Sequence, residues 1–420
     1  MKYSKRVKLK YVADYIQRGD APTYVESNGV PVINQACVQA SGVDQLKIKL
    51  HDPADIDRIT SWLQQNDILI NSTGTGTLGR VAHVREEPNL PMFADGHVTI
   101  IRDSARRFVP RYLFYVLSVQ QEQITVECAE GATNQIELSR HRLGNKYIDW
   151  PSIESQQQLV TRLDQVTDNL NNLISEKRRL ILLLGQKRHA LIASAITRGL
   201  NPNAPHRDSG IPWLGRIPAH WKIERAKWLF VERDIRSDSG DEELLSVSHL
   251  TGVTSRAEKN VNMFMAESME GYKRCEAGDL VINTLWAWMG AMGVARQSGI
   301  VSPAYNVYQP LPVLDPEYVD LLVRTPRFAE EITRYSKGVW SSRLRLYPEG
   351  LYEAWLPVPP KKEQQAIAAY IQEETKKIDN FAQATKRTIA LLQERRSALI
   401  SAAVTGQLMI GAETTEAAAA

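Results

Sequence analysis

The chain has 420 residues, of which 43% are hydrophobic and 24% are charged. At about 100–200 residues per domain this balance allows two to four domains and excludes a disordered chain or a small disulfide scaffold. The net charge is only +3, so any basic surface for nucleic acid must be local. The three cysteines are far apart and form no CxxC pair, which excludes a zinc knuckle and favours a reducing, cytoplasmic setting. No apolar stretch reaches the ~18 residues of a membrane span.

Residues 1–150 are predicted to form a first domain of mixed α+β structure. Apolar runs such as 68–70 are bounded by Gly, Asn, Asp and Pro, which is typical of strands, and a helical stretch is expected at 112–123. Residues 74–79 read Gly-Thr-Gly-Thr-Leu-Gly, but residues 80–84 alternate like a strand instead of opening the helix that a dinucleotide site needs. We interpret this segment as a tight turn between strands.

Residues 151–199 are predicted to form one long helix. Its apolar residues recur in alternating steps of four and three, the spacing of the contact face of a coiled coil. At 1.5 Å per residue, a helix of ~45 residues spans roughly 65–70 Å, which is long for a helix inside one globular domain. The predicted contact positions are Leu159, Leu163, Val166, Leu170, Leu173, Leu180, Leu184 and Leu191.

Residues 200–220 hold four prolines and are predicted to link this helix to a second mixed domain at 221–358, with a helical stretch at 318–335. A second long helix is predicted at 359–406. The tail at 407–420 lacks apolar periodicity and is expected to be disordered. The contact positions of the second helix are Ile367, Ile371, Ile378, Phe381, Leu392 and Leu399.

The two halves of the chain repeat each other. Residues 156–197 match residues 364–405 without a gap, at an offset of 208 residues. The segments before each helix correspond more loosely, as in 66–71 and 278–283. The order domain, helix, domain, helix predicts a duplicated α+β protein whose two long helices form a coiled coil. A pair of ordinary core helices is the alternative.

Sequence patterns for catalysis or cofactor binding are absent. The chain contains no GxxxxGK[ST], HExxH or GxSxG, and no [DNS]PP[YFW], the tetrapeptide with which amino-methyltransferases hold a flipped base. The eight histidines show no metal-ligand spacing. The sequence therefore predicts no catalytic residue and no metal site in this chain.

Several segments resemble the specificity subunits of type I restriction–modification systems. Ser-Gly-Ile-Pro-Trp-Leu-Gly-Arg-Ile-Pro-Ala-His-Trp resembles the start of a target-recognition domain, and Glu-Gln-Gln-Ala-Ile resembles a helical region of that family. The first half departs from the pattern, since Ser155 stands where the second has Glu363, and no Trp-Leu-Gly precedes it. The resemblance extends over about residues 8–406, and its segments are 66–70, 209–221, 278–282, 363–367 and 395–406.

The resemblance implies a non-catalytic reader of DNA sequence. Two target-recognition domains would each read half of a bipartite, asymmetric double-stranded DNA site. The two helices would form an antiparallel, pseudo-twofold spacer that docks two modification subunits. Those partners would bring S-adenosylmethionine and methylate adenine, and restriction subunits that need ATP and Mg²⁺ would join to cleave. The chain itself is expected to hold no cofactor.

DNA contacts are expected in the loops where the two halves differ most, because bases are read by side chains presented in a groove. Solvated turns are the alternative for these loops, and Trp286 and Trp288 could equally lie in the core. The candidate residues are Thr73, Thr75, Thr77, Arg80, Thr133, Asn134, Gln135, Arg140 and Arg142 in the first half, and Trp286, Trp288, Ser341, Ser342, Arg343 and Arg345 in the second.

A different class of function fits the same repeat. A coiled-coil scaffold or adaptor could use two domains and two helices without binding DNA. A salt-sensitive, sequence-dependent complex with DNA distinguishes a specificity subunit from such a scaffold.

Overall fold

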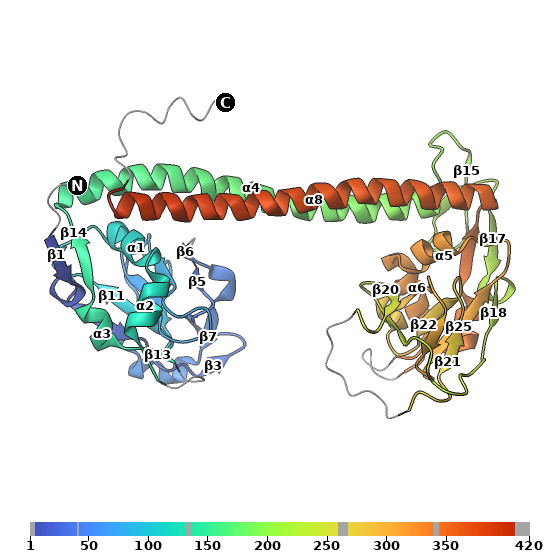
Figure 1. Ribbon diagram of the computed structural model, residues 1–420, viewed down its shortest axis with the longest axis horizontal. Helices are drawn as coiled ribbons and strands as arrows, with labels where there is room; N and C mark the ends of the chain where they lie inside the picture. Colours follow the sequence, from blue (N-terminus) through green and yellow to red (C-terminus); the bar gives the residue numbers. More distant parts are fainter. Residues whose placement is uncertain (1–4, 40–41, 132–135, 259–267, 339–343, 408–420) are drawn as a thin grey trace. The chain divides into compact units, whose positions relative to one another are not determined.

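The computed structural model describes residues 5–39, 42–131, 136–258, 268–338 and 344–407. The chain divides into two compact units: unit 1 is Met1–Arg178 with Lys386–Ala420, and unit 2 is Arg179–Thr385. Two long helices, α4 (Ile153–Arg198) and α8 (Lys361–Val404), each contribute one part to unit 1 and the other part to unit 2 (Figure 1). The predicted disordered tail, apart from Gln407, lies outside the described residues.

Unit 1 contains two four-stranded sheets. The first, which is antiparallel, consists in order of β2 (Tyr15–Arg18), β11 (Val98–Arg102), β8 (Ile68–Asn71) and β9 (Val81–His83). The second consists of β10 (Phe93–Ala94), β4 (Val30–Ile33), β7 (Lys49–His51) and β3 (Tyr24–Val25). The strand pairs are β1 (Lys5–Lys8) with β14 (Tyr147–Trp150), β5 (Val38–Gln39) with β6 (Gly42–Val43), and β12 (Ala129–Glu130) with β13 (Glu137–Leu138). The short helices are α1 (Pro110–Ser118), α2 (Gln121–Cys128) and α3 (Arg140–Asn145).

Unit 2 contains one four-stranded antiparallel sheet. It consists in order of β18 (Phe230–Glu232), β25 (Tyr305–Pro310), β22 (Leu280–Asn283) and β23 (Met292–Val294). The strand pairs are β17 (Lys222–Arg225) with β26 (Trp355–Val358), β19 (Leu245–Ser248) with β20 (Gly252–Ser255), β21 (Lys273–Cys275) with β24 (Gly299–Val301), and β15 (His206–Asp208) with β16 (Arg216–Pro218). The short helices are α5 (Pro316–Val323), α6 (Pro326–Tyr335) and α7 (Pro348–Glu353).

The two units share one plan, which confirms the duplicated α+β fold. The order β2-β11-β8-β9 in unit 1 corresponds to β18-β25-β22-β23 in unit 2. In both units, the last strand before a long helix pairs with the first strand of the domain, as β14 with β1 and β26 with β17. The two apolar runs that the sequence aligns, 66–71 and 278–283, hold the equivalent strands β8 and β22.

The helical stretches predicted at 112–123 and 318–335 are each divided into two helices. In unit 2 the division falls at Pro326, which has no backbone N–H to continue helix α5. The side chain of Thr325 accepts a hydrogen bond from the backbone N–H of Phe328 and so caps the start of α6. The helical periodicity of the sequence runs through this cap and does not reveal it.

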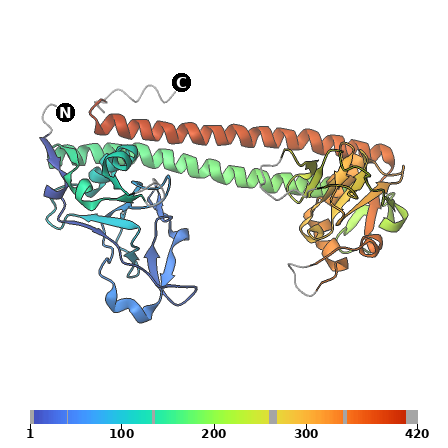
Figure 2. The ribbon, with the colours of Figure 1, turned by 60° about the horizontal axis from the view of Figure 1, so that its bottom comes forward.

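In unit 1 the first part of α4 and the last part of α8 lie side by side and run antiparallel (Figure 2). Leu163 shares an apolar core with Ile400. Further along α4, Asn171 Oδ1 accepts a hydrogen bond from Arg396 Nη1 at 2.6 Å. The later residue of α4 thus contacts the earlier residue of α8, as expected for an antiparallel pair.

Unit 2 repeats this helix contact with equivalent residues. Ile196 of α4 and Ile371 of α8 share its core, and Arg188 Nε lies 3.3 Å from Asp379 Oδ1. Each of these four residues stands 208 positions from a residue that makes the corresponding contact in unit 1. The predicted antiparallel pairing of the two helices is confirmed within each unit.

The contact face of the helices differs from the predicted one by a single residue in places. Val166 (40% exposed) and Leu173 (44%) face solvent, whereas their neighbours Thr167 and Ile174 are buried; Phe381 (52%) is also exposed. Thr167 and Ile174 are seven residues apart, so the contact face keeps a heptad spacing in which one of the two positions is shifted by one residue. The other predicted positions are buried at Leu159, Leu163, Leu184, Ile367, Ile371 and Ile378, and half-buried at Leu170, Leu180, Leu191, Leu392 and Leu399.

The segment 200–220, predicted as a linker, is packed into unit 2. Strands β15 and β16 form a hairpin, and the turn between them buries Trp213 and Leu214. Both side chains belong to the same core as Ile196 of α4. The prolines and glycines of this segment therefore form a hairpin that contributes to the domain core.

A buried glutamine connects each long helix to the domain beside it. Gln156 and Gln364 stand 208 residues apart, and both side chains are fully buried. Each accepts a hydrogen bond from a backbone N–H next to a short helix, from Val109 at 2.9 Å before α1 and from Asp315 at 2.8 Å before α5. Each also donates to the carbonyl of the proline five residues earlier, at 3.0 and 2.8 Å. The repeat thus preserves a polar bond in the same place in both units.

Candidate nucleic-acid interface

Two candidate loops predicted separately meet in each unit. In unit 1 the turn 72–80 joins β8 to β9, and the backbone N–H of Leu138 donates to the carbonyl of Ser72 at 2.8 Å. In unit 2 the backbone N–H of Leu346 donates to the carbonyl of Thr284 at 2.9 Å, at the start of the turn between β22 and β23. Leu138 and Leu346 are 208 residues apart, so each unit joins its turn to a later segment of its own chain through the same backbone bond. We call the turn and the bonded segment of each unit its composite surface.

The glycine pattern at 74–79 forms a tight turn, as predicted. Gly74, Gly76 and Gly79 have φ values of 97°, 76° and 76°, which L side chains rarely adopt. Strand β9 follows the turn directly, so the turn does not open a helix as a dinucleotide-binding loop must. These residues therefore do not form a dinucleotide-binding loop.

Beside this turn, unit 1 has a groove of about 1580 Å³. Thr73, Thr75 and Arg140, three of the predicted DNA-binding residues, line it, so the structure brings them together. The Arg140 guanidinium donates a hydrogen bond to the side-chain oxygen of Gln17 on β2. Guanidinium and carboxamide groups are the side chains that hydrogen-bond guanine and adenine edges in DNA.

Other predicted residues near the groove are held by partners within the protein. Arg142 Nε lies 2.9 Å from Glu130 Oε1, and the Thr77 hydroxyl donates to the backbone carbonyl of Thr73 at 3.1 Å. Arg80 donates to the side chain of Gln39 at 3.3 Å. These contacts hold the side chains of Arg142, Thr77 and Arg80 against other parts of the protein. We therefore expect these three residues to position the surface more than to read bases.

The groove also includes residues that comparison of the two halves does not select. Gln17 and Arg18 come from β2, more than 100 residues before Arg140 in the chain, and His141 and Asn145 come from α3. Arg18 Nη1 lies 2.8 Å from Glu137 Oε2. No local pattern marks Gln17 and Arg18, because they lie on β2 and reach the groove only through the tertiary fold.

In unit 2 the corresponding turn is aromatic. Trp286 is 50% exposed and Trp288 is half-buried, so Trp286 is not a core residue. Arg345 is half-buried, and its guanidinium carbon lies 5.4 Å from the centroid of the Tyr347 ring. The remaining candidates lie outside the described residues; they are Thr133, Asn134, Gln135, Ser341, Ser342 and Arg343.

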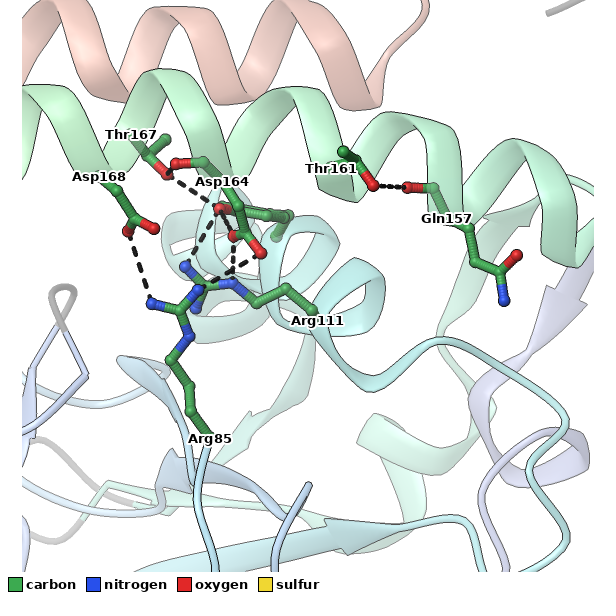
Figure 3. Close-up of polar contacts among 8 residues, drawn as sticks. Arg85, Arg111, Gln157, Thr161, Asp164, Thr167 and Asp168 are labelled. Carbon is green, nitrogen blue, oxygen red and sulfur yellow. Dashed lines mark hydrogen bonds and ion pairs between the residues drawn. The ribbon is translucent and has the colours of Figure 1, made fainter.

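A cluster of charges connects the domain of unit 1 to α4 (Figure 3). Asp164 of α4 accepts from Arg111 Nε at 2.7 Å and from the Tyr115 hydroxyl at 2.5 Å, both on α1. Arg85 Nη2 lies 3.3 Å from the other oxygen of Asp164, and Arg85 Nη1 lies 3.5 Å from Asp168. Two carboxylates of the long helix thus balance two guanidinium groups of the domain.

The buried imidazole next to this cluster does not add to its charge. Burial, together with the nearby charges of Arg111 and Arg85, lowers the pKa of His83 to about 4. His83 is therefore neutral at pH 7, and the cluster depends on its arginines and carboxylates.

We expect Asp164→Ala to weaken the attachment of the unit 1 domain to α4. The substitution leaves both arginines and the Tyr115 hydroxyl without this acceptor, and since the carboxylate is 25% exposed we expect a loss of about 1–2 kcal/mol in the free energy of unfolding. Urea denaturation of the full chain measures this loss. Gln372, at the equivalent position of α8, is exposed, so Gln372→Ala is the matched control. Equal losses in the two variants would contradict the role of Asp164.

The described residues hold neither a membrane-spanning helix nor a metal cluster. Among residues 5–407 that the structure describes, no helix is long and apolar enough to span a bilayer. Within the same ranges, no group of three or more His, Cys, Asp and Glu side chains is placed to hold a metal ion. The three cysteines are buried free thiols, and burial raises the pKa of Cys37 to about 11 and of Cys275 to about 12.

Comparison with known sequences finds one family. Residues 3–182 match the model of the type I restriction modification DNA specificity domain. The chain is 25% identical over 200 residues to the type I restriction enzyme EcoBI specificity subunit of Escherichia coli. That match spans 47% of this chain and 37% of the relative.

Comparison with solved structures finds the same fold over nearly the whole chain. A chain from a study of complex assembly and conformational transition of the type I R-M system matches with a TM-score of 0.66 at 14% identity, covering 97% of this chain and 99% of that one. The HsdS subunit from Thermoanaerobacter tengcongensis matches with a TM-score of 0.50 at 17% identity, covering 96% and 97%. Two long helices and mixed sheets are therefore shared with solved proteins of this kind.

Proposed function

We propose that the whole chain, whose residues 3–182 match the type I restriction modification DNA specificity domain, reads the target sequence for a type I restriction–modification complex. Each unit would read one half of a bipartite, asymmetric DNA site. The observation that carries this proposal is the duplicated composite surface: the same backbone bond supports different side chains at the turns 72–80 and 284–291. To read two different half-sites, a duplicated protein needs the same backbone scaffold in both units and different side chains on it.

We further propose that two modification subunits dock on the long helices. Two pairs of apolar side chains at equivalent positions are exposed on these helices, Leu173 with Phe381 and Leu183 with Leu391. Equivalent surfaces fit two copies of one partner. The partners would carry S-adenosylmethionine, methylate adenine and recruit restriction subunits that use ATP and Mg²⁺. The chain itself would be non-catalytic, and its DNA ligand would place it in the cytoplasm.

The test exchanges one reading domain. Replacing residues 215–358 with the corresponding domain of a relative is expected to change one half-site of the methylated sequence and to leave the other half-site unchanged. Sequencing of methylated DNA from cells with the wild-type or exchanged chain measures both half-sites. The parent chain without modification subunits is the control and should give no methylation.

Two outcomes would contradict the proposal. Methyl transfer by the chain alone would contradict its non-catalytic role. DNA binding that is neither sequence-dependent nor weakened by salt would favour the coiled-coil scaffold instead, because phosphate contacts release counterions and weaken as salt rises.

A further inference from the structure

In unit 2 the turn between β22 and β23 exposes apolar side chains. The rings of Trp286 and Trp288 are stacked, with centroids 6.1 Å apart and planes 20° apart. Leu285 and Met289, on either side of the pair, are exposed as well. Apolar side chains gathered on one exposed turn mark a contact surface, because leaving them in water is unfavourable.

The turn is held firmly from its inner side. Ala287, between the two tryptophans, is fully buried, and the hydroxyl of Thr284 donates to the carbonyl of Ala304 at 2.8 Å. The indole N–H of Trp288 donates to the carbonyl of Leu285 at 3.1 Å. Trp288 therefore uses its hydrogen-bond donor inside the turn and contributes an apolar face to the surface.

Cationic side chains come from the strand segment bonded to this turn. The N–H of Leu346 donates to the carbonyl of Thr284, and the backbones of Lys337 and Arg345 exchange two hydrogen bonds of 2.9 Å next to it. Apolar faces beside cations fit a polyanion that also displays apolar groups. Duplex DNA is such a ligand, because phosphates surround the thymine methyl groups in its major groove.

Unit 1 presents different chemistry at the equivalent place. Thr73 and Thr75 of its turn line the groove together with Arg140 and Gln17, which are bonded to each other. Hydroxyl, guanidinium and carboxamide groups are suited to hydrogen bonds with base edges, whereas the tryptophan pair offers aromatic faces. The two half-sites should therefore be distinguished by different kinds of contact.

We propose that Trp286 and Trp288 read thymine in the half-site of unit 2, through apolar contact with the C5 methyl group. This inference rests on the proposed function and names the chemical feature that one reading surface recognises. The C5 methyl is the apolar group that base pairs display in the major groove. Stacking on an extruded base would also bury the rings, but it requires unpairing of the duplex, which costs a few kcal/mol. Methyl contact needs no such distortion.

The experiment compares thymine with uracil, which lacks only this methyl group. The preferred site is first selected from random duplexes with the full chain, alone and with its modification subunits. Each thymine of the site is then replaced singly by uracil, and affinity is measured by competition. In one half-site, uracil is expected to weaken wild-type binding about three- to tenfold at one or more positions. The same substitution should have no further effect on Trp286→Ala.

Two controls isolate the contact. Trp228 is another exposed tryptophan of unit 2, near Lys227 and outside the turn, so Trp228→Ala should keep the full uracil penalty. Uracil in the other half-site should affect the wild type and Trp286→Ala equally. A circular dichroism spectrum and a denaturation midpoint like the wild type's show that Trp286→Ala is folded.

The possible failures are distinguishable. A selected half-site without thymine, or a uracil penalty unchanged in Trp286→Ala, overturns this inference and leaves the proposed function standing. If Trp286→Ala weakens binding equally for thymine and uracil and also abolishes a bend in the DNA, the tryptophan acts as an intercalating wedge. That outcome also overturns methyl reading. If neither preparation selects any sequence, the proposed function fails and this inference fails with it.

Discussion

A chain that ends after residue 205 is expected to form a twofold dimer. In unit 1, Leu159 and Leu163 share a core with Ile400 and Val404 of α8. Truncation removes this part of α8 and leaves both leucines facing water. Because burial of one leucine contributes about 1.5–3 kcal/mol, the exposed stripe favours association with another helix.

A second copy can provide the missing helix. The residues of α4 that stand 208 positions before Ile400 and Val404 are Ile192 and Ile196, and they pack in the corresponding core of unit 2. Likewise Arg188 stands 208 positions before Arg396, the partner of Asn171, so the inter-helix hydrogen bond can also form between two copies. With modification subunits, the dimer should direct methylation to an interrupted palindrome built from one half-site.

Sedimentation equilibrium of residues 1–205 at micromolar concentration measures the expected doubling of mass. The matched variant is Ile196→Asp in the same fragment, which places a charge in the proposed contact and should give monomers. The full chain at the same concentration is the reference. A soluble, folded fragment that stays monomeric would show that α4 cannot replace α8.

Gln156→Leu and Gln364→Leu are each expected to lower the free energy of unfolding by about 2–4 kcal/mol, because leucine fills a similar volume but leaves a buried N–H and a buried carbonyl unpaired. Each glutamine is fully buried and bonded to the segment before α1 or α5. Under the proposed function, each variant should weaken recognition of a different half-site. Urea denaturation and mapping of methylated sites measure the two effects.

Each glutamine has an exposed glutamine directly after it, which provides the control. Gln157→Leu and Gln365→Leu change the same residue type on the solvent side of the same helices and should alter stability by less than about 0.5 kcal/mol. Losses as large as those of Gln156→Leu would mean that the buried bonds do not carry the effect. Loss of both half-sites in one variant would contradict the assignment of one reading surface to each unit.

The sequence predicts the duplication and the long helices well, because the duplication repeats residues at one offset and the helices repeat apolar residues at a helical spacing. The helix contact face is less predictable, since Val166 and Leu173 are apolar but exposed, while the buried Thr167 bonds through its hydroxyl to Tyr115. Similarly, the proline-rich segment around Trp213 has the composition of a linker and yet packs in a core. Composition and periodicity report average preferences, and tertiary contacts decide these cases.

The candidate site is predicted only in part, for a related reason. The loops containing Thr75 and Arg140 differ between the two halves, so comparison of the halves selects them. Gln17 reaches the same groove through the tertiary fold, which no local pattern encodes. The sequence also leaves the exposure of Trp286 open, because tryptophan occurs both in cores and on binding surfaces.

The division of unit 1 into two distant segments has a consequence for biosynthesis. Its last part, residues 386–404, leaves the ribosome after the whole of unit 2. At ~5–20 residues per second, synthesis of the intervening chain takes roughly 10–40 s, during which Leu159 and Leu163 lack their cover. Unit 2 can therefore close first, although the sheets of unit 1 are made earlier. During this interval the nascent chain is open to pairing with a neighbouring copy on the same messenger, so the speed of translation and the spacing of ribosomes become determinants of correct assembly.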